Sequence, residues 1–333
     1  MLSRVAESIY WMARYVERAE NIARMVQVNW HLTLDTASTG PQWQPLVSIT
    51  ADDELFAELY GEATESNVVQ FLAFDSGYPN SIYSCLSAAR ENARSVREII
   101  PADLWEQINT FYQQVRDSSK NPAIKRSPYS FFEMVIKESN EFIGRSLTTM
   151  IHDDGWHFCR SGRMLERADK TSRILDVKYF YLLPSIDYVG TPVDNIQWSA
   201  LLRSASALQA YRQRYGQIDP AKVVELLLLD DEFPRSVRYC VELTQKSISR
   251  MSGSERGRLT NDAERSCDQL RSQLACARVE EVIELGLHEF VDSLQIKLNH
   301  IGGNIQKTFF LTGAEDESDV GSSQVQKSAV IDA

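Results

Sequence analysis

Glycine and proline, the residues that most often interrupt helices, are scarce in this sequence, at 15 and 10 of 333 residues. Apolar residues instead recur at three- and four-residue spacing through nearly every segment, which is typical of α-helices packed on a core. The sequence therefore predicts an all-α fold, a helical bundle. The expected helices cover residues 2–36, 51–60, 64–74, 79–99, 101–118, 128–150, 154–182, 194–215, 219–229, 234–250, 254–276 and 279–310.

Cysteine is also rare, and its spacing argues against a metal site or a disulfide framework. The sequence has five cysteines and no CxxC or Cys/His metal spacing; they are Cys85, Cys159, Cys240, Cys267 and Cys276. We expect reduced thiols in a cytoplasmic protein and no structural zinc. No apolar run approaches the roughly 18 residues of a membrane span. The first twenty residues carry charges where a signal peptide would be apolar.

Positive charge is in deficit over the whole chain. There are 35 Lys and Arg residues against 46 Asp and Glu residues, which gives a formal net charge of -11. Binding to nucleic acid or to an anionic membrane needs concentrated positive charge, so neither partner is expected, and any anion site must be local. The sequence has neither a Walker-type phosphate loop nor an HExxH zinc motif. We therefore expect no cofactor and no metal bound by this chain.

Two pairs of matching segments lie at similar separations along the chain. The stretch ARYVERAENIARM, residues 13–25, matches GRMLERADKTSRI, residues 162–174, with glutamate and arginine at the same places. The stretch FLAFDSGYPNSIYSCL, residues 71–86, matches LLLLDDEFPRSVRYCV, residues 226–241. Two ordered matches of this kind predict a tandem duplication of a helical unit.

The predicted duplication divides the chain into two units and a tail. We expect a first helical repeat unit at 1–150 and a second at 151–312, packed on the first as one globular domain. The remaining residues, 313–333, are polar and lack aromatic side chains, which predicts a disordered tail.

The matching stretches 13–25 and 162–174 each carry a stripe of glutamate and arginine. At about 100° per residue, the charged side chains of each helix gather opposite its apolar face. Ordinary surface pairs three or four residues apart would form with lysine as readily as with arginine. Both helices favour arginine, which is preferred in buried ion pairs and in bidentate recognition of carboxylate or phosphate. We expect the two helices to face each other across an approximate two-fold, with their stripes meeting as a polar layer inside the bundle.

A third arginine-rich stretch, LSAARENARSVREII, occurs only in the first unit, because the second unit has VELTQKSISRM at the matching place. The first unit is therefore the better candidate for a ligand role. No catalytic residue is assigned. The candidate substrate-binding residues are Arg14, Glu17, Arg18, Asn21, Arg90, Glu91, Asn92, Arg94, Arg163, Glu166 and Arg167.

Five stretches give the chain a family resemblance. They are YWMARYVERAENIARM, ARENARSVRE, LWEQIN, GRMLERADKTSRILDVKY and DNIQWSALLRSASALQAY. With these motifs the chain resembles the alpha-E domain family, all-helical bacterial proteins named for their Glu-Arg motif, over about residues 1–312. The resemblance implies an association with circularly permuted ATP-grasp proteins of the carboxylate-amine ligase type, often with a transglutaminase-like peptidase. It implies an accessory or co-catalytic subunit of an amidoligase, with ATP and Mg²⁺ bound by the partner and a peptide-like or amino-acid-like substrate.

Two other interpretations stay open at this point. The chain would be a stand-alone enzyme acting on amides or peptides if Glu17 or Glu166 had a raised pKa and served as a general base. Arginines beside these carboxylates argue against that, because they lower a carboxyl pKa. Alternatively, the Glu-Arg stripes would have a purely structural role and would fix the registry of the two units.

Overall fold

The computed structural model describes residues 1–35, 43–181, 192–255 and 258–311. Most of these residues are helical and none lies in a β-strand, so the predicted all-α class is confirmed. The predicted disordered tail, 313–333, lies outside the described residues, as does most of the segment 183–193 that separates two of the expected helices.

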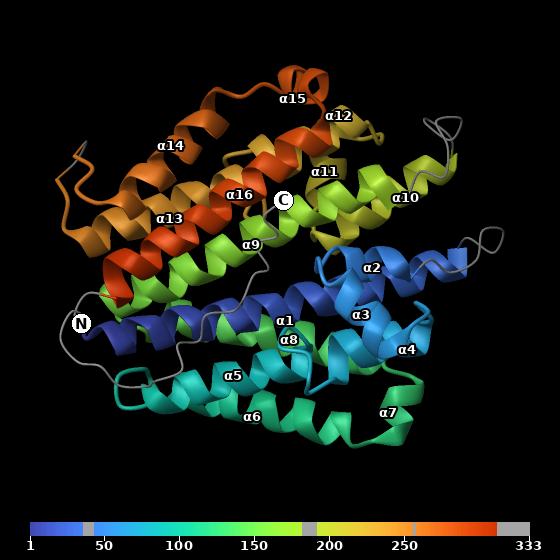
Figure 1. The fold of residues 1–333 in the computed structure, drawn as a ribbon, viewed down its shortest axis with the longest axis horizontal. Helices are drawn as coiled ribbons and strands as arrows, with labels where there is room; N and C mark the ends of the chain where they lie inside the picture. The colour runs from blue at the N-terminus through green and yellow to red at the C-terminus, as the bar shows by residue number, and fades with distance from the viewer. Residues whose placement is uncertain (36–42, 182–191, 256–257, 312–333) are drawn as a thin grey trace.

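Two long helices, α1 (Ser3–Asp35) and α9 (Asp154–Tyr181), lie side by side through the middle of the molecule (Figure 1). On one side, α1 packs against two of the helices of the first unit, and those helices pack against a third. These are α5 (Ile82–Ser95), α6 (Ala102–Ser119) and α8 (Tyr129–Thr149). The first unit is therefore a group of four long helices.

The second unit repeats this arrangement around α9. Its long helices are α13 (Val237–Ser252), α14 (Asp262–Cys276) and α16 (Leu287–Ile305), and α9 packs against α13 and α16. The order of elements is the same in both units, which is what a tandem duplication would produce. The duplication itself stays a prediction.

Short helices connect the long ones. They are α2 (Gln44–Ser48), α3 (Asp53–Tyr60), α4 (Glu65–Val69), α7 (Pro122–Arg126), α10 (Pro192–Ser204), α11 (Leu208–Tyr215), α12 (Pro220–Val224) and α15 (Val279–Leu285). Three π-helical segments continue α4, α12 and α16, namely η1 (Gln70–Phe74), η3 (Glu225–Leu229) and η4 (Gln306–Phe310). Helix α7 lies in a segment that the sequence indicated as a loop.

Several predicted helices end earlier or split. The helix expected over 194–215 breaks at Ser206, which has a left-handed backbone with φ of 54°. The helix expected over 279–310 breaks at Gly286, whose φ of 95° is a conformation that glycine adopts readily. Helix α5 stops at Ser95 instead of residue 99, and helix α14 begins at Asp262 instead of residue 254. At α14 the reason is a cap, because the Asn261 side chain accepts a hydrogen bond from the Glu264 amide at 2.9 Å.

The turns that start α5 and α13 have the same geometry. The hydroxyl of Ser81 accepts a hydrogen bond from the Ser84 amide and donates one to the Asp75 carbonyl. Ser236 makes the equivalent pair with the Tyr239 amide and the Asp230 carbonyl. These serine caps fix the first turns of the two helices.

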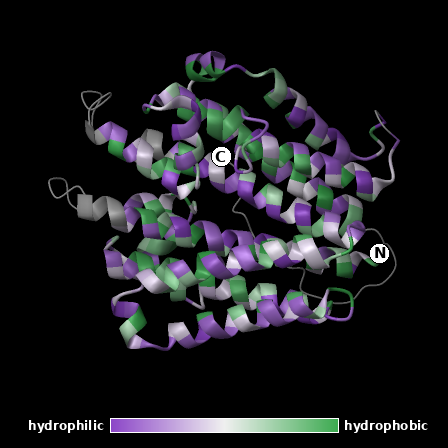
Figure 2. Cartoon of the chain, turned by 180° about the vertical axis from the view of Figure 1, so that it is seen from behind, coloured by the Kyte–Doolittle hydropathy of each residue, from purple (hydrophilic) through white to green (hydrophobic). Residues whose placement is uncertain are grey.

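The central helices approach each other closely at Gly162 of α9. A side-chain carbon at this position would lie 2.4 Å from the backbone oxygen of Tyr10, well inside van der Waals contact. Both helices are buried over most of their surface, and apolar residues gather between the layers of helices (Figure 2). The Glu-Arg stripes therefore lie in the middle of the bundle, where a charge must find a partner.

Candidate functional site

The candidate site is the layer of charged side chains between α1 and α9. We call it the charge layer and define it by its carboxylates and the cations that contact or neighbour them. The carboxylates are Glu17, Glu20, Glu166 and Asp169. The cations are Arg14, Arg18, Arg24, Arg163, Arg167, Lys170, Arg173 and Arg235.

Glu166 of α9 binds two arginines of α1. Its Oε1 accepts a hydrogen bond from Nε of Arg18 at 2.6 Å, and its Oε2 accepts one from Nη2 of the same residue at 3.0 Å. Nε of Arg14 donates to Oε2 at 2.9 Å. The side chain of Glu166 has no exposed surface. Because the Arg18 contact is bidentate, it fixes the carboxylate plane as well as its charge.

Glu17 of α1 makes the reciprocal contact with α9. Both Nε and Nη2 of Arg167 donate to its two carboxylate oxygens at 2.7 Å. Arg235, which precedes α13, adds a longer contact at 3.4 Å, and the amide of Asn21 adds one at 3.3 Å. Each long helix thus gives one buried glutamate to the other and receives one, as the matching stripes predicted.

The outer carboxylates of the layer are paired with cations of their own helices. Glu20 accepts hydrogen bonds from Nε of Arg24 at 2.7 Å and, across the bundle, from Nη2 of Arg235 at 2.5 Å. Asp169 accepts from Arg173 at 3.0 Å and from Lys170 at 3.1 Å. In total the charge layer holds eight cations and four carboxylates, an excess of four positive charges in a chain whose net charge is -11.

Glu17 and Glu166 are held ionised. Burial alone would raise the pKa of Glu17, but the charge and hydrogen bonds of Arg167, helped by Arg235, overcome it and lower the pKa to about 2. Burial would also raise the pKa of Glu166, but the positive charges of Arg18 and Arg14 outweigh this effect. The pKa of Glu166 therefore lies well below its usual range. A carboxylate with so low a pKa is a weak base near neutral pH, so neither glutamate is suited to general-base catalysis.

These low pKa values predict a loss of stability in acid. A carboxyl whose pKa is lower in the folded state stabilises the protein above its unfolded pKa of 4.5, and this stabilisation disappears as the pH falls toward about 2. Each such group contributes roughly 2–3 kcal/mol when fully ionised. We expect the free energy of unfolding, measured with urea, to fall steeply between pH 5 and pH 2.

Two glutamine variants separate this effect from general acid denaturation. Glu17→Gln removes a titrating group of the charge layer, so its stability should depend less on pH than that of the unmodified protein. Glu91→Gln is the surface control, because its side chain is 46% exposed and solvent screens its ion pairs. Equal pH dependence of stability in all three proteins would contradict a lowered pKa of Glu17 in the folded state.

The arginine-rich stretch of α5 does not join the charge layer. Arg90 donates to Asn109 of α6 at 2.8 Å and to Glu91 at 2.7 Å, and Arg94 also pairs with Glu91. The first of these contacts lies between α5 and α6, and the pairs with Glu91 are exposed to solvent. Only Asn92 points inward, and it is 7% exposed. The predicted residues therefore fall into two groups, with Arg14, Glu17, Arg18, Asn21, Arg163, Glu166 and Arg167 in or beside the charge layer.

Arg163 is the least satisfied member of the layer. It is 6% exposed, and its Nε and Nη1 atoms have no hydrogen-bond partner in the part of the chain that the structure describes. Burial and the neighbouring Arg167 lower its pKa. Arg14, at the matching position of α1, donates a hydrogen bond to Glu166. The matching carboxylate for Arg163 would be Glu17, which is already bound by Arg167.

Arg235 belongs to the site although the sequence motifs did not indicate it. It reaches Glu17, Glu20 and Asn21 from the turn before α13. The alignment of 71–86 with 226–241 places Asn80 at the matching position, so the arginine is not part of the repeated pattern. A comparison of the two repeats for positions where a charge appears in only one of them would have singled it out.

The described residues hold no group of three or more His, Cys, Asp or Glu side chains that would bind a metal ion. Among the helices of residues 1–35, 43–181, 192–255 and 258–311, none is long and apolar enough to cross a bilayer.

Comparison with known proteins identifies a family for the chain. Residues 1–310 match the model of Alpha-E, described as a predicted alpha-helical domain with a conserved ER motif. An uncharacterised protein of Mycobacterium bovis and two of Mycobacterium tuberculosis are each 24% identical to the chain over 304 residues. Each match covers 85% of this chain and 33% of the relative, so the chain spans about a third of the length of these relatives. No solved structure matches the chain significantly.

The match covers both long central helices and every residue of the charge layer. The family's description names an ER motif, and this chain has two Glu-Arg dipeptides, Glu17-Arg18 and Glu166-Arg167, whose side chains form the two reciprocal ion pairs. The chain belongs to the Alpha-E family.

Proposed function

We propose that the chain is a helical accessory subunit of an ATP-grasp carboxylate-amine ligase system. In this proposal the partner is a circularly permuted ATP-grasp protein, which binds ATP and Mg²⁺ and forms the amide or peptide bond. A transglutaminase-like peptidase is a further partner in the same system. The Alpha-E chain contributes to the binding of the carboxylate or peptide-like substrate.

The observation that carries the proposal is the excess of cations in the charge layer. Eight cations share four carboxylates, and one of these cations, the buried Arg163, has two nitrogen atoms without a hydrogen-bond partner in the described part of the chain. Arginine and lysine that outnumber their carboxylates are suited to a carboxylate of a substrate. The low pKa of Glu17 argues against a base of the chain's own, so the bond-forming chemistry is assigned to the partner.

The length of the relatives also supports a role beside other domains. Two thirds of each mycobacterial relative lie outside the matched region. An Alpha-E domain in those proteins is therefore one part of a larger chain. A subunit that acts together with a catalytic partner fits this arrangement better than an independent enzyme does.

A structural scaffold is the second candidate function. The reciprocal pairs Glu17–Arg167 and Glu166–Arg18 join the two units and fix the registry of α1 against α9, which supports this interpretation. A scaffold would still dock on a partner. It would differ from the first candidate because substitutions in the layer would change stability without a specific effect on ligation.

Copurification tests the proposal. The tagged full-length chain is purified from its native cells under mild conditions, with and without ATP, and the proteins that elute with it are identified by mass spectrometry. We expect an ATP-grasp protein in an amount comparable to the chain itself. Recovery of the chain alone under both conditions would contradict the ligase partnership.

Ligation by the purified pair then separates the accessory role from the scaffold. Arg14→Ala and Arg163→Ala, both in the charge layer, should lower the ligation rate by roughly tenfold, the equivalent of one lost charge-assisted hydrogen bond. Arg97→Ala is the control, because Arg97 is 62% exposed and pairs with its neighbour Glu98 on the surface. Unchanged ligation by all three folded variants would favour the scaffold.

A further inference from the structure

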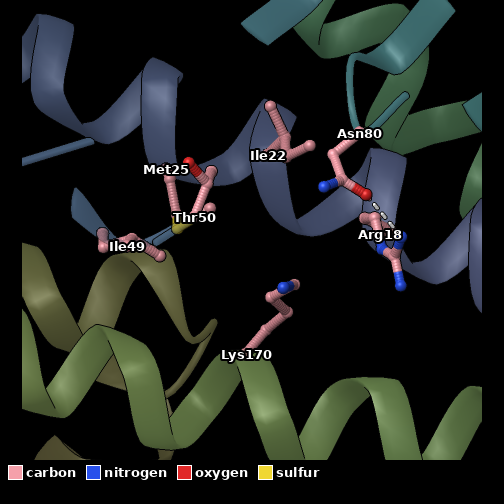
Figure 3. A pocket seen from close by; sticks show the side chains of 7 residues that line it. All are labelled: Arg18, Ile22, Met25, Ile49, Thr50, Asn80 and Lys170. Atoms are coloured by element: carbon pink, nitrogen blue, oxygen red, sulfur yellow. Dashed lines mark hydrogen bonds between the residues drawn. The ribbon is translucent and has the colours of Figure 1, made fainter. Parts of the chain in front are cut away.

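The hollow that Arg18, Asn80 and Lys170 line beside the charge layer is closed by its own side chains (Figure 3). Nη1 of Arg18 donates to Oδ1 of Asn80 at 2.6 Å, and Nζ of Lys170 donates to Asp169 at 3.1 Å. The space left open is about 10 Å³, roughly enough for one water molecule. This hollow is therefore part of the charge layer and not a separate ligand site.

A much larger groove lies on the second unit, between α13 and α14. Its volume is about 710 Å³, which falls within the range of roughly 300–1,000 Å³ typical of small-molecule sites. Every side chain that lines it is polar, and the most buried of them is Gln245, at 8% exposed. Lys246, Ser249 and Arg250 lie on one face of α13 and line the groove, and Arg271 lines it from α14. The groove is thus large enough for a small polar ligand.

Two cations of the groove have no partner of their own. Lys246 and Arg250 are exposed and lie one turn apart on α13, and neither forms a hydrogen bond or an ion pair within residues 1–35, 43–181, 192–255 and 258–311. The carbonyls of Ser249 and Arg250 accept hydrogen bonds from the amides of Ser254 and Gly253, so the two cations do not cap the helix end. Like charges at this spacing repel each other, and an anion between them would relieve the repulsion.

The carboxylates around the groove are engaged elsewhere. Glu242, which lines the groove, accepts a hydrogen bond from Arg238 at 3.2 Å. Asp268 accepts one from Nε of Arg271 at 2.9 Å. Glu264 has no exposed surface and is held by hydroxyl and amide groups of the loop before α14. The lining therefore has an excess of positive charge, in a chain whose net charge is -11.

The first unit balances the corresponding charges. When the alignment of 71–86 with 226–241 is continued along the helices, Glu91 of α5 falls at the position of Lys246, and Arg94 falls at the position of Ser249. Glu91 pairs with both Arg90 and Arg94 at 2.7 Å. In α13 a lysine replaces this glutamate, so the carboxylate that would neutralise the neighbouring cation is missing from the helix.

The two units also differ in how the space between these helices is filled. In the first unit, the guanidinium of Arg90 lies over the rings of Trp105 and Tyr112 of α6, at 5.9 and 5.2 Å from the ring centres. The matching residue of α13 is the shorter Gln245, whose Nε2 turns back to donate to Oγ of Ser249 at 3.3 Å. The second unit therefore has both the open space and the unbalanced charge.

We propose that the groove between α13 and α14 binds the phosphate group of a small polar phosphate monoester. A phosphate carries close to two negative charges near neutral pH and offers three acceptor oxygens. The planar fork of Arg250 suits two of these oxygens, and Lys246 suits the remaining charge. Because the lining side chains are polar and not aromatic, the rest of the ligand is a hydroxylated group and not a stacked base. This site does not depend on the proposed ligase partnership.

Titration calorimetry on the isolated full-length chain, at constant ionic strength, tests the binding. The ligands are glycerol 3-phosphate and inorganic phosphate, with glycerol and succinate as controls that lack the phosphate group. We expect saturable binding of glycerol 3-phosphate with a Kd of about 1 mM or below, and no tighter binding of free phosphate. Both controls should bind at least about tenfold more weakly than glycerol 3-phosphate. Failure of glycerol 3-phosphate to bind, tighter binding of free phosphate, or equal binding of either control would overturn the proposal.

Two variants that install residues of the first unit locate the site. Lys246→Glu places a carboxylate where α5 has Glu91, and Arg250→Ser reproduces Ser95. Each should weaken binding of glycerol 3-phosphate at least about tenfold, while circular dichroism shows an intact helical fold because both positions are exposed. Full binding by either folded variant would overturn the assignment.

Lys307→Glu is the matched control for net charge. Lys307 is an exposed lysine of η4 outside the groove, and its replacement changes the charge of the chain by the same amount as Lys246→Glu. This variant should bind glycerol 3-phosphate normally. An equal loss of binding in Lys307→Glu and Lys246→Glu would mean that the overall charge, and not the groove, attracts the ligand, and would overturn the proposal.

Discussion

Replacement of Glu166 by alanine is expected to lower the free energy of unfolding by about 3–5 kcal/mol. Glu166 has no exposed side-chain surface and binds both Arg14 and Arg18. Its removal leaves these two guanidinium groups, and the nearby Lys170, as buried or half-buried cations without their main counter-charge. The penalty comes from these uncompensated charges more than from the lost contact. Urea unfolding monitored by circular dichroism measures it.

Glu91→Ala is the matched control for this prediction. Glu91 also lies between two arginines, Arg90 and Arg94, at distances of 2.7 Å, but its side chain is 46% exposed. Solvent screens such pairs, so the loss should stay below about 1 kcal/mol. If Glu91→Ala lowered the free energy of unfolding as much as Glu166→Ala does, burial of the carboxylate would not explain the loss.

A double-mutant cycle separates the pair from its surroundings. Arg18→Ala alone leaves Glu166 with Arg14 and Lys170, and the combined Arg18→Ala and Glu166→Ala variant removes both members of the bidentate contact. Because these residues touch, the combined loss should be smaller than the sum of the single losses by about 1–3 kcal/mol. Additive losses would mean that the two groups do not interact in solution.

The sequence was sufficient for the fold class and for the central helix pair. The three- and four-residue spacing of apolar residues is a local property of the chain, and it survives in the buried faces of α1 and α9. The use of arginine at matching places indicated buried ion pairs, and Glu17 with Arg167 shows that geometry.

Other features depend on contacts that the sequence pattern does not encode. The stretch ARENAR has the same residue types as the stripe of α1, yet Arg90 lies against α6, where it donates to Asn109, and Arg94 is exposed. The apolar face of α5, which includes Ile82, Leu86 and Ala89, packs into the core in place of the arginines. The break at Ser206 was also unpredictable, because a left-handed serine carries no glycine or proline signal.

Arg235 and Lys170 show why the site was only partly predictable. Both differ from the residue at the matching position of the other repeat, so a search for repeated patterns passes over them. The structure brings Arg235 to Glu20 across 215 positions of sequence. The pattern shared by the two units therefore indicates the reciprocal ion pairs, and the differences between the units change which further side chains contact these pairs.

Gly162→Ala is expected to destabilise the protein, although alanine normally stabilises a helix relative to glycine. The new side-chain carbon would lie 2.4 Å from the backbone oxygen of Tyr10, and a backbone atom cannot move aside as the end of a side chain can. The two central helices must therefore separate. Overpacking of this kind typically costs about 1–3 kcal/mol, which exceeds the gain of up to roughly 1 kcal/mol in helix propensity. Gly162→Val should cost more, because it adds two further carbons at the same place.

Gly144→Ala is the matched control, since Gly144 also lies inside a helix, α8, but has no atom near the position of the added carbon. This variant should be as stable as the unmodified protein or more so, by up to roughly 1 kcal/mol. Equal stability of the two alanine variants would contradict the close approach of α1 and α9 at Gly162.

The Gly162 variants also connect packing to the charge layer. Glu166 lies one helical turn from Gly162, so a separation of the helices that is large enough to admit a methyl group lengthens the hydrogen bonds from Arg18, now 2.6 and 3.0 Å. Ala13 occupies the matching position of α1 and is fully buried, so that helix accommodates a side-chain carbon there. The requirement for glycine therefore falls on α9 alone. Gly162→Ala should consequently reduce the stabilising effect of Glu166, measured as a smaller loss when Glu166→Ala is added to Gly162→Ala than when it is made alone.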